Sequence, residues 1–204
     1  MRFVRAVTRD SRAWVFVAAG LAACALLGWP VNHESIDWQP ALALSQPWRA
    51  FTAVGVHYSL QHLIGNLAGV ALAGVFGVAA LVPQRMAWAW LAAWPLTHLG
   101  LLVKPALSHY GGLSGVVHAG VAVVIVCVLS SGTRRQRWVG GAVLVGFCAK
   151  LLSESPWGEV LRHPTGWDIA VAPIVHATGA LAGALCAAIA LLLPHRTSTR
   201  ANHD

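Results

Sequence analysis

Ser114 and His176 are the residues whose types and positions best suit nucleophilic catalysis. Ser114 opens an apolar run directly behind a pair of glycines, and His176 lies near the start of a later apolar run. A serine hydroxyl becomes a strong nucleophile when a neighbouring base takes its proton, and histidine is the side chain that most often does so. Each residue lies near the start of its run, so the two can meet at similar depth if the two runs pack side by side. The spacing therefore predicts Ser114 as nucleophile and His176 as general base.

A developing oxyanion also needs hydrogen-bond donors, and a third segment supplies two of them. His62 and Asn66 are four residues apart, which places them on one face of a helix. Ser114 begins a helix, where backbone N–H groups lack partners and the helix dipole is positive. We expect the oxyanion hole to consist of His62, Asn66 and the Ser114 N–H.

The residues around His176 indicate how it is positioned and whether a carboxylate assists it. Gly179 and Gly183 follow it at a small-xxx-small spacing, which lets two helix backbones approach closely. No carboxylate lies within any apolar run, and Asp168 stands eight residues before His176 in a loop. The residues therefore favour a Ser–His dyad over a triad.

Each of these residues also has an ordinary structural interpretation. Serine is a common helix N-cap, a histidine in a membrane helix can bond a neighbouring carbonyl, and GxxxG spacing most often serves packing. His98, His118 and His176 are also candidate haem ligands, although no two of them share a run at the spacing of a two-haem cytochrome helix. On spacing alone, catalytic and structural roles both remain open.

The segments that carry these residues are strongly apolar. Of the 204 residues, 57% are hydrophobic and 10% are charged, whereas a soluble domain has about 25% charged residues. An ordinary soluble enzyme is excluded, and the pattern indicates one all-α membrane domain over residues 1–204. A helix needs about 20 residues to cross the hydrocarbon core. Six runs are long enough or nearly so: 13–29, 62–82, 86–103, 114–130, 138–153 and 171–193.

The basic residues indicate how these six spans are oriented. Most of them flank the spans on one side: Arg2, Arg5, Arg9, Arg12, Arg85, Arg134, Arg135, Arg137, Arg196 and Arg200. Because lysine and arginine are enriched in cytoplasmic loops, we expect both termini in the cytoplasm and the serine and histidine near the outer surface. These loop charges account for the net charge of +7 without a groove for nucleic acid. Lys150, near the end of the short fifth span, can extend its amine to the interface.

Cys24 follows Leu21-Ala22-Ala23 behind a basic start, as at a lipoprotein acylation site. The apolar run continues beyond Cys24, where a lipoprotein usually turns polar, so we expect an uncleaved first helix. The four cysteines have neither zinc-type spacing nor the pattern of a disulfide framework. We expect no metal and no cofactor.

Four motifs, in chain order, resemble those of the rhomboid family of intramembrane serine proteases. They are Trp48-Arg49, His57-x-Ser59-x-x-His62-x-x-x-Asn66, Gly112-Leu113-Ser114-Gly115 and His176-x-x-Gly179-x-x-x-Gly183. The resemblance covers about residues 48–183 and implies a six-helix bundle that needs no metal or nucleotide. It assigns the same nucleophile, base and oxyanion hole as the spacing does. It also implies an outward loop, half-embedded in the outer leaflet, and site-supporting residues that include Trp48, Arg49, His57, Gly112, Gly115, Gly179 and Gly183.

One position departs from the family pattern. Many rhomboids have a tyrosine four residues after the serine, packed against the catalytic histidine, and this chain has His118 there. By the resemblance, His118 either stacks on His176 as the tyrosine would or perturbs the pKa of His176. Both alternatives stay open.

The short chain and the string GLSGVVHA, residues 112–119, are most similar to the rhombosortase branch of the family. This resemblance implies a multi-pass enzyme of the bacterial inner membrane whose site opens to the periplasmic side. Its expected partners are the lipid bilayer and transmembrane substrates with Gly-rich, Gly-Gly-type C-terminal tails, with no nucleic acid. The alternative is a rhomboid-like pseudoprotease that binds membrane segments without cleavage, which would need neither Ser114 nor His176.

Overall fold

A computed structural model describes residues 9–193 of the chain. Six long helices form a bundle: α1 (Arg9–Gly28), α4 (Leu60–Ala79), α5 (Gln84–Leu99), α6 (Ser114–Ser131), α7 (Arg134–Ser153) and α8 (Pro173–Leu192). Short helical segments lie between them: α2 (His33–Ile36), η2 (Pro40–Leu42), α3 (Arg49–Thr52), η3 (Ala53–Gly55) and η4 (Gly100–Val103). Over residues 9–193 there is no strand, and the expected all-α class is confirmed.

The six expected spans coincide with the six long helices, but one of these helices is less apolar than a span requires. Five segments are long and apolar enough to cross a membrane: Ser11–Gly28, Leu60–Ala79, Gln84–Val103, Ser114–Ser131 and Pro173–Leu192. The fifth expected span, 138–153, belongs to α7, which begins earlier and includes Arg134, Arg135 and Arg137 as well as Lys150. These charges lower the mean hydropathy of α7, so its crossing of the membrane stays a prediction.

Local caps, rather than hydropathy, set where several helices begin. Ser59 Oγ accepts a hydrogen bond from the His62 N–H at 3.1 Å, so α4 begins at Leu60. Thr133 and Gln136 form a reciprocal capping box at the start of α7. These caps explain why the observed helices start before the apolar runs expected at 62 and 138.

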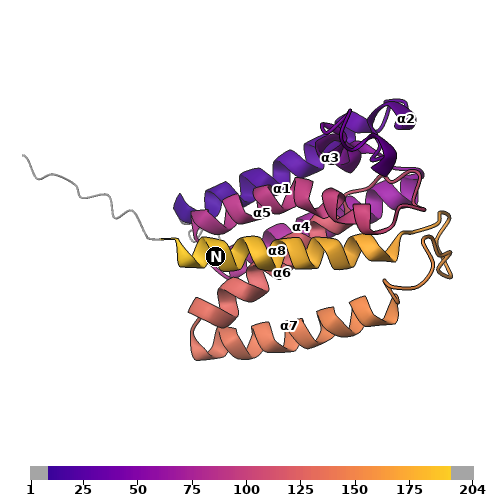
Figure 1. Cartoon of the computed structure of the whole chain (residues 1–204). Helices are drawn as coiled ribbons and strands as arrows, with labels where there is room; N and C mark the ends of the chain where they lie inside the picture. Colours follow the sequence, from indigo (N-terminus) through magenta and orange to yellow (C-terminus); the bar gives the residue numbers. More distant parts are fainter. Residues whose placement is uncertain (1–8, 194–204) are drawn as a thin grey trace, which may run out of the picture.

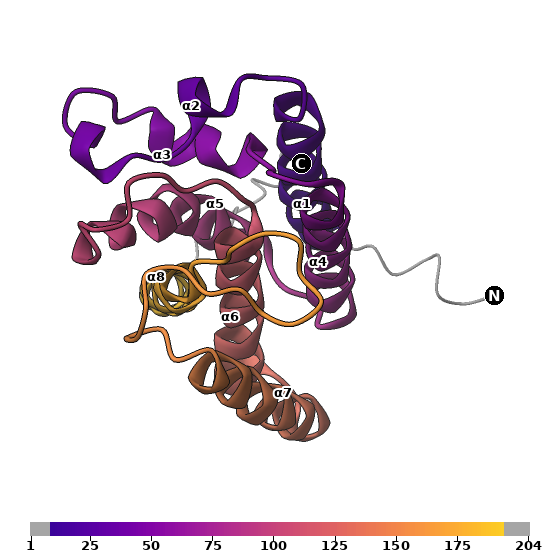
Figure 2. The same ribbon diagram turned by 90° about the vertical axis from the view of Figure 1, so that its right-hand side faces the viewer.

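α6 lies at the centre of the bundle and packs against α8, α5, α4 and α7 (Figures 1 and 2). The approach of α8 is especially close because glycines face α6. A Cβ atom on Gly179 would overlap the carbonyl oxygen of Gly115, and one on Gly183 would overlap that of Ala119. This contact fixes the two helices that carry the serine and the histidine.

α7 diverges from the bundle over much of its length (Figure 1). Gly140 is the buried residue of this helix, and it lies near Val128 of α6. Trp138 and Val145 of α7 are largely exposed, as are Phe16 and Leu72 on other helices. Apolar faces of this kind suit contact with bilayer hydrocarbon.

Candidate active site

α6 and α8 bring the Ser114 hydroxyl to the His176 ring. Ser114 is the first residue of α6, and His176 lies in the first turn of α8. Ser114 Oγ and His176 Nε2 are 3.0 Å apart, which is a hydrogen-bond distance. The His176 side chain is buried. With Nε2 unprotonated, this geometry allows the imidazole to take the hydroxyl proton.

The loop before Ser114 has a backbone conformation that requires glycine. Gly112 has a φ of +137°, and a Cβ atom there would lie 2.9 Å from His62 Nε2. A Cβ atom on Gly115 would lie 2.6 Å from Val175 Cγ2. Gly112 therefore lets the loop lie close to α4, and Gly115 lets the start of α6 lie close to α8.

His62 and Asn66 are both buried on α4. The Tyr58 N–H donates to His62 Nδ1 at 3.4 Å, which leaves the Nε2 of His62 as a donor beside Gly112. Asn66 Nδ2 is buried and has no hydrogen-bond partner within residues 9–193. Buried donors without a partner are uncommon and require an explanation such as a ligand. His62 lines one cavity with the serine and the histidine, whereas Asn66 lies one helical turn further along α4 and does not line it.

His118 stacks on His176. The ring centroids are 4.2 Å apart and the planes differ by 17°. His118 Nδ1 also lies 2.7 Å from the carbonyl oxygen of Ser114. The structure thus shows the stacked arrangement, and an effect of His118 on the pKa of His176 stays a prediction.

A carboxylate that the sequence interpretation did not consider reaches His176. Glu154, directly after α7, has Oε2 2.7 Å from His176 Nδ1, and its Oε1 lies 2.9 Å from Lys150 Nζ. The preference for a dyad rested on the absence of carboxylates within the spans, and this geometry does not support it. The sequence signal for Glu154 is its i,i+4 spacing from Lys150, which favours an ion pair at the end of a helix. Asp168, which stands eight residues before His176 in the sequence, instead accepts a hydrogen bond from Ser59 Oγ at 2.7 Å.

The candidate site opens into a cavity of about 660 Å³, within the usual range of ligand pockets. The loop between α7 and α8 crosses the end of the bundle and borders this cavity (Figure 2). Gln61 Nε2 donates to the Gly166 carbonyl at 2.8 Å, and Trp167 packs against Gly65. These contacts tie the loop to the start of α4.

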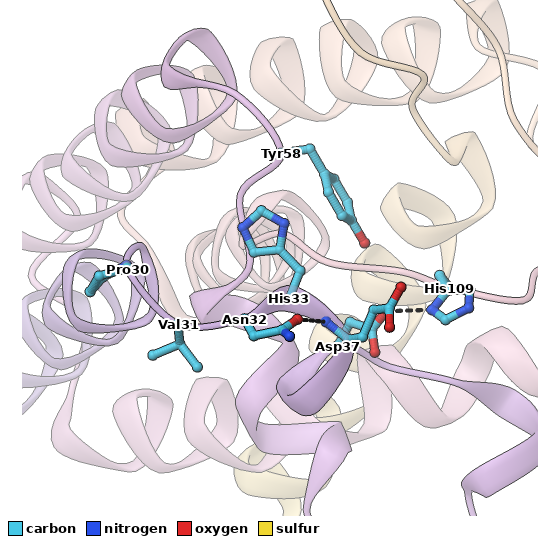
Figure 3. Close-up of a pocket in the computed structure, with 8 residues that line it drawn as sticks. Pro30, Val31, Asn32, His33, Asp37, Tyr58 and His109 are labelled. Carbon is cyan, nitrogen blue, oxygen red and sulfur yellow. Dashed lines mark hydrogen bonds and ion pairs between the residues drawn. The ribbon is translucent and has the colours of Figure 1, made fainter.

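Trp48 and Arg49 lie outside this cavity, in the long connection between α1 and α4. Arg49 is buried and donates to Asp37 Oδ1 at 3.0 Å, while His109 Nδ1 lies 2.6 Å from Asp37 Oδ2. Asp37 thereby joins α3 to the loop before Ser114, beside a second cavity of about 730 Å³ (Figure 3). Trp48 is half exposed. Arg49 is thus linked through Asp37 to the loop that precedes the serine, and its role in supporting the site stays a prediction.

Two further buried histidines, His57 and His98, contact backbone carbonyls of the connection between α1 and α4. The ring of His57 lies next to the ring of His62, with the two centroids 4.8 Å apart. Burial, with a smaller contribution from the charge of His33, lowers the pKa of His57 to about 4 despite a hydrogen bond to Gly55, so His57 is neutral at pH 7. His98 Nδ1 lies 2.6 Å from the Ala50 carbonyl.

The structure also describes the surroundings of Cys24 and the side chains that could bind a metal. Cys24 lies inside the continuous helix α1. Within residues 9–193, no group of three or more His, Cys, Asp or Glu side chains has an arrangement that could hold a metal ion.

Comparison with known families agrees with the motifs. Residues 44–193 match the model of the family described as Rhomboid domain, a range that includes all four motifs. No curated protein and no solved structure gives a significant match. The family comprises intramembrane serine proteases and related pseudoproteases, and the five span-length apolar helices agree with a multi-pass membrane protein. The chain belongs to the rhomboid family of membrane proteins.

Proposed function

We propose that this protein is an intramembrane serine endopeptidase, with Ser114 as nucleophile and His176 as general base. The contact of 3.0 Å between Ser114 Oγ and His176 Nε2, at a cavity, carries the proposal. The structural interpretation of the serine as an N-cap has little support, because Leu113 occupies the cap position of α6. A serine hydroxyl directed at a buried histidine fits nucleophilic catalysis better.

The proposed reaction proceeds through an acyl-enzyme. His176 Nε2 takes the proton as Ser114 Oγ attacks the substrate carbonyl, and the imidazolium later gives that proton to the leaving amine. The Ser114 N–H, His62 Nε2 and Asn66 Nδ2 are the proposed donors to the oxyanion. The absence of a protein partner for Asn66 Nδ2 within residues 9–193 supports this role. Water or another acceptor then resolves the acyl-enzyme.

The proposed substrates are membrane proteins whose C-terminal tail has a Gly-Gly motif, an apolar helix and a basic end. The similarity of residues 112–119 to rhombosortases supports this class. Glycine destabilises a helix by about 1 kcal/mol relative to alanine, so a Gly-Gly tail unwinds more easily at the site. If all six helices cross the bilayer, the basic residues favour cytoplasmic termini and a cavity on the periplasmic side of a bacterial inner membrane.

A pseudoprotease that binds membrane segments without cutting them is the alternative. Such a protein has no need of an activated serine or of spare oxyanion donors. The Ser114–His176 contact and the unpartnered Asn66 amide therefore favour the protease.

A membrane reporter that ends in a Gly-Gly tail tests the proposal when it is co-expressed with the wild type. We expect a shortened reporter with the wild type and none with Ser114→Ala or His176→Ala. A matched reporter with Leu-Leu in place of Gly-Gly should stay intact, since its tail resists unwinding. Copurification of an uncut Gly-Gly reporter with the wild type would favour the pseudoprotease, and equal cleavage by Ser114→Ala would exclude the mechanism.

A further inference from the structure

Polar contacts form a closed ring around His176. From Ser114 the ring passes through His176 to Glu154, at 3.0 Å and 2.7 Å. Glu154 then contacts Lys150 at 2.9 Å, and Lys150 Nζ contacts His118 Nε2 at 2.6 Å. The ring closes where His118 Nδ1 meets the Ser114 carbonyl oxygen at 2.7 Å. Three helices and the residue after α7 therefore share one network.

One set of proton positions satisfies every contact of this ring. The Lys150 ammonium can only donate, so His118 Nε2 accepts and His118 Nδ1 carries the proton that is donated to the Ser114 carbonyl. An ionised Glu154 can only accept, so His176 Nδ1 carries a proton, which it donates to Glu154 Oε2 at 2.7 Å while Lys150 Nζ lies further away at 3.4 Å. His176 Nε2 is then left to accept from the serine hydroxyl. This is the tautomer that a general base requires.

Glu154 is ionised in this setting. Burial raises the pKa of Glu154, but the hydrogen bond and charge of His176, together with those of Lys150, lower it to about 2. The Glu154 side chain is 27% exposed, so the carboxylate is only partly shielded from water. A negative charge beside Nδ1 favours the imidazolium that forms when the histidine takes a proton.

A simpler interpretation is that Glu154 only pairs with Lys150 at the end of α7. That interpretation accounts for Oε1, which faces Lys150, but not for Oε2, which faces His176 of α8. The buried residue of α7, Gly140, lies near α6, and Phe147 of α7 stacks on His118, so neither of these packing contacts involves Glu154. The two oxygens therefore have separate partners and separate roles.

We propose that Glu154 is a positioning residue that completes a Ser114–His176–Glu154 triad. Its carboxylate holds His176 in the tautomer with Nε2 free and stabilises the imidazolium. The proton taken from the serine stays on His176 until it passes to the leaving amine, and Glu154 stays ionised throughout. This inference rests on the proposed function and replaces the dyad expected from the sequence.

The test is the rate at which the full-length protein, purified in detergent, reacts with a fluorophosphonate probe. The maximal rate and the half-saturating probe concentration are determined separately. Glu154→Gln keeps the size of the side chain and removes its charge, and Glu34→Gln makes the same change at an exposed residue of α2 that does not line the cavity of the candidate site. Lys150→Met removes the ion pair and the Nζ contacts with His118 Nε2 and His176 Nδ1, but it leaves Glu154 Oε2 beside His176.

We expect the maximal labelling rate of Glu154→Gln to fall about 100-fold with an unchanged half-saturating concentration. Glu34→Gln should match the wild type, and Lys150→Met should lose less than Glu154→Gln. If the wild type is labelled and Glu154→Gln equals Glu34→Gln, the triad is wrong while the nucleophile stands. Equal losses in Lys150→Met and Glu154→Gln would also overturn the triad, because the ion pair alone would then explain both. A wild type that takes no label would overturn the proposed function and the triad together.

Discussion

The α6–α8 interface and α7 hold the candidate site in different ways. At the interface the backbones are so close that a Cβ atom on Gly179 would overlap the carbonyl of Gly115. On α7, a Cβ atom on Gly141 or Gly146 would meet nothing within 4 Å. Steric packing thus fixes the helices that carry the serine and the histidine, whereas polar contacts hold Glu154 against His176.

The two regions should therefore respond differently to substitution and to pH. The close approach of α6 and α8, which brings Ser114 near His176, depends on backbone packing that charge and pH scarcely alter. The Glu154–His176 contact depends on ionisation and on Lys150. Changes at the interface should therefore affect folding and activity together, while changes at the end of α7 should affect activity or acid stability alone.

The largest effect is expected for Gly179→Ala. The added methyl cannot fit beside the Gly115 carbonyl, so we expect loss of fluorophosphonate labelling and destabilisation by about 3 kcal/mol or more. Gly146→Ala on α7 is the matched control, and it should keep full labelling and gain up to about 1 kcal/mol. Thermal unfolding in detergent measures both variants. Wild-type labelling and stability in Gly179→Ala would show that the interface is not tightly packed.

An intermediate effect is expected at α4, which contributes donors rather than the nucleophile or the base. Asn66→Ala should lower the reporter cleavage rate about 100- to 1,000-fold, less than Ser114→Ala, because other oxyanion donors remain. Its fold should be retained, since Asn66 Nδ2 has no protein partner within residues 9–193 to lose. Asn32→Ala, in the distant cap of α2, is the matched amide control. Equal cleavage by Asn66→Ala and Asn32→Ala would remove Asn66 from the oxyanion hole.

The smallest effect is expected in acid. Because the pKa of Glu154 is lowered to about 2, its contacts stabilise the folded state above its ordinary pKa, near 4.5, and this stabilisation is lost as the pH falls towards 2. Glu154→Gln should therefore lose less stability than the wild type over this interval. Glu34→Gln should follow the wild type, as measured by unfolding at a series of pH values. Parallel curves for the wild type and Glu154→Gln would contradict the contact.

The sequence indicated the α6–α8 region better than the α7 region. Ser114 and His176 could be selected because each lies near the start of an apolar run, where helix depth follows from residue number. Glu154 could not, because its role depends on how far a side chain after one helix reaches across to another. The same holds for Asp37, which contacts Arg49 and His109 from distant parts of the chain. Contacts between loops have no periodic signal.

The most direct test of the central claim is to identify the residue that a fluorophosphonate probe modifies in the detergent-purified wild type. Peptide mass spectrometry locates the adduct, with Ser114→Ala and His176→Ala labelled in parallel. We predict an adduct on Ser114 in the wild type and no adduct in either variant. An adduct on another residue, or a folded wild type that takes no label, would contradict an activated serine at the start of α6.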